Sequence, residues 1–240
     1  MRIPRHIGLI PDGNRRWAQD KGLQKQDGYD FGLDPGLAAL KLSVEYGIDE
    51  ITYYGFTTDN CKRPKIQIES FVKACVDAVN IIAKENVSLL VLGNTKSPMF
   101  PKELLKYTKR TNIGNGGIKV NFLVNYGWDW DISNINVTSS NRKTIMDCLH
   151  SKDISRIDLI IRWGGRKRLS GFLPVQSVYS DIYTIDDLWP DFTPEQFHNA
   201  ITDSCRYNLF IQTFIQLMIC GLISLLNNFI MQLNGTTIRM

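Results

Sequence analysis

Short apolar runs alternate with helix-forming segments along most of the chain, and this rhythm limits the folds that it can adopt. The apolar runs, some almost wholly aliphatic, are typical of strands buried on both faces of a sheet. Strand–helix–strand order of this kind indicates a parallel sheet. We therefore predict an α/β fold with a central, mostly parallel sheet flanked by helices. The predicted strands lie at 6–10, 51–56, 87–92, 118–124 and 157–161.

The predicted helices begin or end at residues whose backbone preferences favour a boundary. Asp34 and Pro35 fit a helix cap and first turn, and Gly47 fits the end of that helix. A longer helix is expected after Pro64. No repeat or linker interrupts the pattern, so one domain is expected. Two further helices are predicted at 101–109 and 142–149.

The composition agrees with a globular domain that binds an anion. The chain has 240 residues, of which 43% are hydrophobic and 22% are charged, so it can bury a sizeable core. Its net charge of +4 favours an anionic ligand or an anionic membrane surface. Because the basic residues do not spread along the chain as a nucleic-acid patch would require, we expect no nucleic-acid partner.

The cysteines and the N-terminus indicate the compartment. Five cysteines are scattered without a C-x-x-C pair, which argues against a disulfide framework and against a zinc site. Arg2, Arg5 and His6 stand where a secretory signal would be apolar. We therefore expect a cytoplasmic protein.

The polar segment at 12–16 follows the first predicted strand and has the chemistry of a phosphate site. Gly13 lets the backbone turn and approach a ligand, and amides at a helix start attract anions. Arg15 and Arg16 can donate paired hydrogen bonds to phosphate oxygens. Asp12 would repel a phosphate unless Mg²⁺ lay between them, so the segment indicates a magnesium–phosphate site. The alternative is an Asp12 helix cap followed by a solvated basic turn.

A second cationic segment follows the last aliphatic run. It contains a Gly-Gly pair, then Ser170, and four cations: Arg162, Arg166, Lys167 and Arg168. Guanidinium groups, backbone amides and a hydroxyl can together hold a diphosphate; the alternative is a solvated charge run. Ligands of parallel sheets bind beyond the carboxyl ends of the strands, which is where both cationic segments are expected.

Taken together, the ordered motifs resemble the cis-prenyltransferase family, typified by undecaprenyl diphosphate synthase. The resemblance implies a catalytic domain over 1–208 with an apolar substrate tunnel, Mg²⁺ as cofactor, isoprenoid diphosphates as substrates and a homodimer. It rests on seven stretches: His6–Asn14, Arg16–Ala18, Phe56–Asn60, Arg63–Pro64, Asn125–Gly127, the run Arg162-x-Gly164-Gly165-x-x-Arg168-Leu169-Ser170-x-Phe172, and Leu188–Phe192.

The resemblance also implies a role for each matching residue. Asp12 would hold Mg²⁺ on the allylic diphosphate, and Asn60 and Arg63 would lie over the reacting centre. Asp181 falls where the family has a metal-binding Glu, and Arg206 where it has an Arg-x-Gly that reaches across the dimer; here Asn208 replaces that Gly. Further substrate-binding residues would be Arg15, Trp17, Lys25, Tyr29 and Arg206, and the first diphosphate would be cradled by Gly13, Asn14 and Arg16. The second would contact Arg162, Arg166, Arg168 and Ser170.

Departures from the usual pattern resemble an irregular branch of the family, the cyclolavandulyl and lavandulyl diphosphate synthases. The features that resemble this branch are the run Arg15-Arg16-Trp17, the pair Gly28-Tyr29, and Arg166 in place of an acid. Cys61 in place of Trp is a further departure from the usual pattern. We therefore expect an enzyme that condenses short isoprenoid diphosphates, releases diphosphate and gives a short or branched product. Three alternatives stay open: a long-chain polyprenyl diphosphate synthase, a terpene synthase that ionises one prenyl diphosphate, and a non-catalytic partner subunit.

The C-terminal segment 209–240 forms an atypical tail. Residues 209–237 carry no charge, and the stretch is long enough to cross a bilayer as a helix. Polar residues recur at multiples of four, which places a polar stripe on one helix face. The tail is therefore expected to pack on the protein or a second subunit, to lie on a membrane surface, or to span the membrane. The stripe comprises Gln212, Gln216, Ser224, Asn228 and Gln232.

Overall fold

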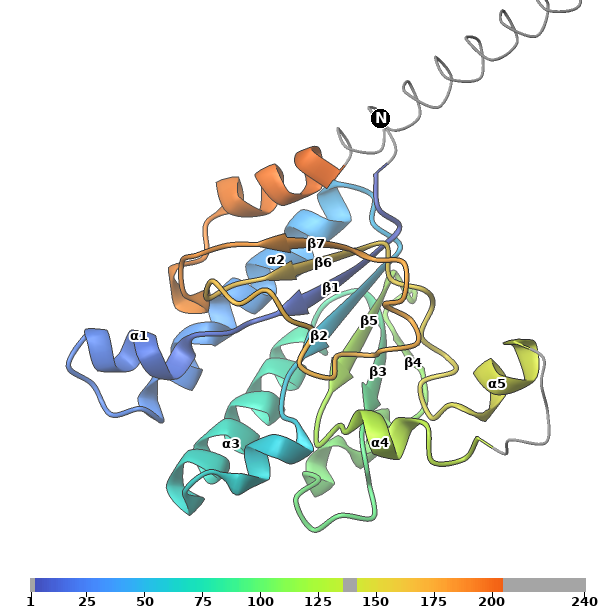
Figure 1. Ribbon diagram of the computed structural model, residues 1–240, viewed down its shortest axis with the longest axis horizontal. Coiled ribbons are helices and arrows are strands. Elements are labelled where there is room, and N and C mark those ends of the chain that lie inside the picture. The colour runs from blue at the N-terminus through green and yellow to red at the C-terminus, as the bar shows by residue number, and fades with distance from the viewer. Residues whose placement is uncertain (1–2, 136–141, 205–240) are drawn as a thin grey trace, which may run out of the picture.

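Seven strands form a single sheet at the centre of the molecule (Figure 1). The computed structural model describes residues 3–135 and 142–204. The sheet order is β4-β3-β5-β2-β1-β6-β7, and neighbours are parallel except β3 and β4. The predicted fold class is therefore confirmed. The strands are β1 (His6–Ile10), β2 (Glu50–Tyr54), β3 (Val87–Leu92), β4 (Thr111–Ile113), β5 (Ile118–Leu123), β6 (Leu159–Arg162) and β7 (Asp181–Thr184).

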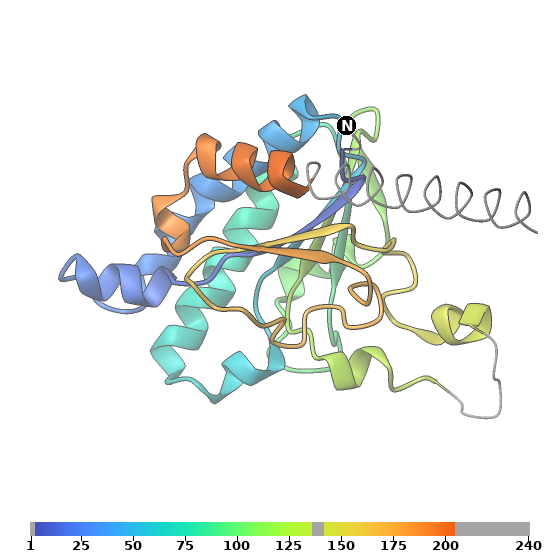
Figure 2. The ribbon, with the colours of Figure 1, turned by 45° about the horizontal axis from the view of Figure 1, so that its top comes forward.

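Helices α2 and α3 contact each other against one face of the sheet, and α1 projects beyond the end of β1 (Figures 1 and 2). Residues 194–204 are also helical. None of the helices in the described ranges is both long and apolar enough to cross a membrane. The α-helices are α1 (Asn14–Asp20), α2 (Leu33–Glu45), α3 (Lys65–Ile82), α4 (Trp128–Asp131) and α5 (Arg142–Cys148). The 3₁₀ helices are η1 (Asp27–Gly32), η2 (Thr58–Lys62), η3 (Lys102–Tyr107) and η4 (Trp189–Asp191).

Most predicted elements are present, with three informative differences. Helix α2 begins at Leu33 without a side-chain cap, because η1 runs directly into it, so the predicted cap at Asp34 is wrong. The segment predicted as a helix at 101–109 is the 3₁₀ helix η3. Strands β4 and β7 were not predicted, since both are short edge strands with partly exposed residues.

The sheet has a separate core on each face because strand side chains alternate between faces. On β1, Ile7 and Leu9 belong to the core beneath α2 and α3, whereas Ile10 belongs to the opposite core. Gly8 faces the opposite core too, where any side chain at this position would overlap the ring of Phe172. The wholly buried strands explain the continuous apolar runs in the sequence.

The strand order creates a crevice at the carboxyl ends of β1 and β6. These strands are paired, with Ile10 opposite Arg162 at their last residues. The chain leaves β1 toward β2 on one side and leaves β6 toward β7 on the other. Loops that diverge in this way open a gap between neighbouring strand ends, which is where ligands of such sheets bind.

At the opposite end of the sheet lies a buried polar network around His6. Its Nε2 lies 2.8 Å from Thr52 Oγ1 and its Nδ1 lies 3.0 Å from the Ser155 carbonyl oxygen. Asn121 donates to both Thr52 and the Glu50 carboxylate. Burial lowers the pKa of the His6 imidazole, which is only 1% exposed.

The stability of the fold should therefore fall as the pH falls below the ordinary histidine pKa of about 6.5. The unfolded chain then binds a proton that folded His6 resists, with a limiting slope of about 1.4 kcal/mol per pH unit. Urea unfolding from about pH 7 to 5 measures this slope. His6→Gln should flatten it, whereas His198→Gln at an exposed position should not; equal slopes in wild type and His6→Gln would contradict the prediction.

Candidate functional site

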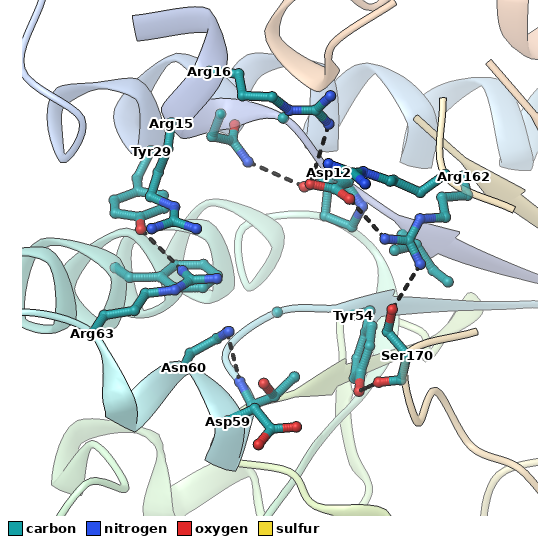
Figure 3. Close-up of a pocket in the computed structure, with 18 of the residues that line it drawn as sticks. Asp12, Arg15, Arg16, Tyr29, Tyr54, Asp59, Asn60, Arg63, Arg162 and Ser170 are labelled. Atoms are coloured by element: carbon teal, nitrogen blue, oxygen red, sulfur yellow. Dashed lines mark hydrogen bonds and ion pairs between the residues drawn. The ribbon is translucent and has the colours of Figure 1, made fainter. Parts of the chain in front are cut away.

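A pocket of about 540 Å³ lies at the crevice between β1 and β6 (Figure 3). Both cationic segments that the sequence singled out contribute to its wall, together with η2 and its flanks. Seven of the lining residues in the described chain are cationic and two are acidic. The cations are Arg15, Arg16, Lys25, Arg63, Arg162, Arg166 and Arg168, and the acids are Asp12 and Asp59. The surplus of positive charge suits a polyanionic ligand.

Asp12 lies between the two cationic segments. Its Oδ2 accepts a hydrogen bond from Arg162 at 2.7 Å, and its Oδ1 lies 3.6 Å from Arg16 (Figure 3). Helix α1 is capped by Gly13 without any side-chain bond, so the alternative of an Asp12 helix cap is wrong. The carboxylate remains one-third exposed and can reach a ligand.

Close backbone contacts fix the turn that carries Asp12. Gly13 has φ 113°, and a side chain there would lie 2.8 Å from Leu188. A side-chain carbon at Gly28 would overlap the carbonyl oxygen of Asn14. The loop of η1 therefore packs directly on the start of α1. Glycine at position 28 lets η1 approach α1 so closely, and glycine at position 13 lets the turn approach Leu188.

Arg162 is the buried centre of the second segment. One terminal nitrogen donates to Asp12, and the other donates to the carbonyl of Arg168 and, at 2.9 Å, to Ser170 Oγ. Tyr54 in turn donates to the Ser170 carbonyl at 2.7 Å. Ser170 has φ 53°, so this tight loop is held by the bonds on either side of it.

A third group of side chains faces the same pocket from η1, from α3 and from η2 with its C-terminal flank. Arg63 donates to the Tyr29 hydroxyl at 3.0 Å, and the Tyr29 ring stacks on Phe71 with 4.5 Å between ring centroids. Burial lowers the pKa of the Arg63 guanidinium, which nevertheless stays cationic at neutral pH. Asn60 accepts from the backbone of Thr57 and so fixes the turn that presents η2 to the pocket.

A smaller apolar cavity of about 70 Å³ lies beside the polar pocket, between the sheet, α2 and α3. Pro11, Asn14, Tyr29, Gly55 and Phe71 line both spaces, so they are adjacent. Next to Gly55, the stacked rings of Tyr53 and Phe122 take up the face of the sheet with 4.8 Å between their centroids.

The carboxylate of Asp12 can serve a divalent cation only in combination with a ligand. Among the described residues there is no cluster of three His, Cys, Asp or Glu side chains that could hold a metal. Mg²⁺ commonly binds proteins through one or two carboxylates and completes its shell with substrate phosphates and water. Asp12 beside an anion pocket fits this mode of binding.

Residues 10–208 match a protein family model described as "Putative undecaprenyl diphosphate synthase". A ditrans,polycis-undecaprenyl-diphosphate synthase of Yersinia pseudotuberculosis is 32% identical over 220 residues, covering 83% of this chain and 86% of that protein. An isoprenyl transferase of Porphyromonas gingivalis is 30% identical over 234 residues, covering 90% and 92%. The chain belongs to the cis-prenyltransferase family. It is therefore an enzyme that transfers prenyl groups, as the sequence motifs predicted.

The fold of this prenyltransferase also matches a solved structure. The crystal structure of lavandulyl diphosphate synthase from Lavandula x intermedia, in complex with dimethylallyl diphosphate, superimposes with a TM-score of 0.74. It is 22% identical, and the match covers 84% of this chain and 95% of that one. The similarity establishes the shared α/β architecture.

The structure brings most of the predicted site residues of the prenyltransferase to the one pocket. Three predicted residues are not placed there. Trp17 donates to Asp191 at 2.7 Å and packs against Phe31 instead of lining the pocket, so its substrate contact stays a prediction. Arg206 lies outside the described residues. The residues that line the pocket as predicted are Asp12, Gly13, Asn14, Arg15, Arg16, Lys25, Tyr29, Asn60, Arg63, Arg162, Arg166, Arg168 and Ser170.

Asp181 also lies away from the pocket. It begins β7 opposite Leu159, whereas the site lies where β6 ends at Arg162. Three residues of strand separate these levels, or about 10 Å. Within one chain, Asp181 therefore begins its strand at the far end from Asp12, and its role as a metal ligand stays a prediction.

Tyr54 contributes to the site although none of the sequence motifs includes it. Its hydroxyl supports the Ser170 loop, and its side chain lines the pocket. The alternation of side chains along β2 could have indicated this role. Tyr54 is the last residue of the strand, and it faces the opposite side of the sheet from Tyr53. Asp59, which belongs to a matching motif but received no role, also lines the pocket.

Gly28→Ala should destabilise this prenyltransferase and should also distort its pocket, so that ligand binding falls by more than the loss of stability explains. The added carbon meets the backbone of Asn14, so α1 must shift, and we expect a loss of about 1–3 kcal/mol in unfolding free energy. Calorimetric affinity for pyrophosphate should fall in parallel. Gly22→Ala is the matched control, since φ 74° strains it while open space surrounds it. Equal affinities in the two variants would contradict the prediction.

Proposed function

We propose that this prenyltransferase joins two short isoprenoid diphosphates, one as allylic donor and one as acceptor, and releases diphosphate. The observation that carries the proposal is the position of Asp12 between two groups of cations at the ends of paired strands. One group, with Gly13, Asn14 and Arg16, would hold the donor diphosphate. The other, with Arg162, Arg166, Arg168 and Ser170, would hold the acceptor diphosphate.

The reaction makes demands that these residues meet. The allylic C–O bond breaks with its electron pair on the departing diphosphate, and the acceptor double bond supplies the pair for the new C–C bond. Arginines aimed at the departing oxygens stabilise the charge that develops there. Mg²⁺ held by Asp12 and the donor diphosphate would supply further neutralisation of that charge. A proton then leaves the joined skeleton for a diphosphate oxygen.

Tyr29, Phe71 and Arg63 would enclose the reacting carbon. The two stacked rings lie against the apolar cavity, and Arg63 lies 5.3 Å from the Phe71 ring centroid. Apolar walls keep water from the electron-deficient carbon. Asn60 from η2 lines the same pocket (Figure 3).

The size of the apolar cavity supports a short product. A group the size of water needs roughly 10–15 Å³ of such volume. The cavity of about 70 Å³ is several times that size but far smaller than the polar pocket of about 540 Å³, which favours a short prenyl group. We propose this cavity as the prenyl site. The undecaprenyl diphosphate synthases among the relatives make the long-chain product the competing proposal.

We also propose three features that depend on residues outside the described ranges. These are a homodimer, contact of the 209–240 tail with a second subunit or a membrane surface, and the division between a 1–208 catalytic domain and the tail. Removing the residues after Asn208 and measuring subunit number and vesicle binding would separate these roles. A truncated chain with unchanged behaviour in both assays would remove the tail from the proposal.

Mass spectrometry of products from five-, ten- and fifteen-carbon allylic diphosphates, with and without isopentenyl diphosphate and Mg²⁺, tests the function. Asp12→Ala should lower kcat by roughly 10²- to 10³-fold, because transition-state charge loses its metal-mediated support. Asp49→Ala is the matched control, since Asp49 pairs with Arg5 at the opposite end of the sheet. Full activity of Asp12→Ala, or turnover of a single diphosphate without any acceptor, would overturn the proposal.

Phe122→Ala should lengthen the product. Removing the ring opens space at the inner end of the cavity, next to Tyr53. We expect the main product to gain at least one isoprene unit, as seen by chromatography of the dephosphorylated products. Tyr53→Phe keeps the ring and loses only its bond to the Gly36 carbonyl, so its product should stay unchanged. An unaltered product from stably folded Phe122→Ala would show that this ring does not limit length.

A further inference from the structure

We infer that the ion pair between Asp12 and Arg162 couples the two diphosphate subsites. Binding of a metal–diphosphate at Asp12 makes the Arg162 guanidinium available to the second diphosphate. The inference rests on the proposed function, since it takes both ligands to be diphosphates. In the protein without ligands, Arg162 positions the Asp12 carboxylate, and it contacts a ligand only after Asp12 has turned away.

The hydrogen bonds of Arg162 are the first evidence. Its two terminal nitrogens are occupied by Asp12, by Ser170 and by the carbonyl of Arg168. Its Nε is buried without a partner in the described structure. The side chain is 4% exposed, and it nevertheless lines the pocket. In this arrangement the guanidinium reaches a ligand only by exchanging one of its present partners.

The chemistry of the three partners makes Asp12 the one that is exchanged. Ser170 and Arg168 offer neutral oxygens on the same short loop, whereas Asp12 offers a charge from a different strand end. A carboxylate that is already paired with a guanidinium attracts a metal ion less strongly. Likewise, a guanidinium that is already neutralised attracts a diphosphate less strongly.

Burial makes the exchange compulsory. An arginine that is almost fully buried cannot lose its counter-ion without a large cost, so it takes a new anion when the old one turns away. Once Asp12 turns to a metal ion, the second diphosphate is the anion at hand. The coupling is reciprocal: a second diphosphate that holds Arg162 also frees Asp12 for the metal.

Arg16 provides an internal comparison. It also faces Asp12, but at 3.6 Å, and its side chain is 42% exposed. Water can therefore compensate its charge when Asp12 moves. The same carboxylate thus has one solvated cation and one buried cation as neighbours, and only the buried one, Arg162, transmits the change to the second subsite.

Calorimetry with inorganic pyrophosphate tests the coupling on the full chain. In EDTA, Asp12→Asn should bind pyrophosphate roughly tenfold more tightly than wild type, because it releases one charge-assisted hydrogen bond of Arg162. Asp59→Asn is the matched control: it removes the same charge from the same pocket, but Asp59 pairs with Lys62. An equal gain in the control, or no gain in Asp12→Asn, would overturn the inference.

A double-mutant cycle excludes simple repulsion between Asp12 and the added anion. In an Arg162→Gln background the gain from Asp12→Asn should vanish, whereas repulsion alone would leave it at full size and overturn the inference. If Arg162→Gln does not fold, as judged by thermal unfolding, Arg162→Lys replaces it. This variant keeps the charge without the forked geometry, so the gain should shrink severalfold; an undiminished gain would again overturn the inference.

The test separates this inference from the proposed function because it uses no prenyl substrate. If the double-mutant cycle shows an interaction between Asp12 and Arg162 but the protein forms no prenyl product, the coupling is supported and the proposed function is contradicted. Conversely, a protein that transfers prenyl groups but shows no interaction energy between Asp12 and Arg162 in the double-mutant cycle would contradict the coupling and support the proposed function. In wild type, Mg²⁺ should tighten pyrophosphate binding, and Asp12→Asn should abolish this dependence.

Discussion

The parallel pairing of β1 with β6 is the constraint on which the site depends. Hydrogen bonds along the strands fix Ile10 opposite Arg162, and the next residues of each chain must then leave the sheet side by side. The sequence distance between Asp12 and Arg162 is 150 residues, yet this register brings them within 2.7 Å. Buried aliphatic and aromatic side chains form a core on each face, so the sheet holds that register against one-residue shifts.

The pocket concentrates positive charge that the protein alone does not balance. Seven cationic side chains face two acidic ones among the described lining residues. The imbalance costs folding free energy through mutual repulsion, and a polyanion recovers it on binding. The polar network around His6 contrasts with this, because its groups satisfy one another at the far end of the same strands. Polar groups at one end of the sheet are thus paired with one another, whereas the cations at the other end face a pocket and can bind a ligand.

The sequence was a good guide to the long buried elements and a poorer guide to short edge elements. The runs of β1 and β3 were predicted to the residue, because strands buried on both faces are continuously apolar. Strand β7 is partly exposed and mixed in composition, and this hid the true setting of Asp181. The motifs placed Asp12 and Arg162 in the site, but no pattern in the sequence shows that they bind each other. The orientation of Trp17 toward Asp191 was equally hidden, since it depends on the return of η4 to α1.

The contact of Gly28 with the carbonyl of Asn14 has a mechanical consequence. Helix α1 and η1 lie backbone on backbone, and the Trp189 indole anchors the end of η1 by donating to the Gly32 carbonyl at 2.9 Å. The stretch from Asn14 to Gly32 is therefore held at both ends by backbone contacts, which oppose a hinge motion of the whole stretch. A ligand bound beside this stretch would therefore be accommodated by rotation of side chains, while the backbone around Asn14 keeps its shape.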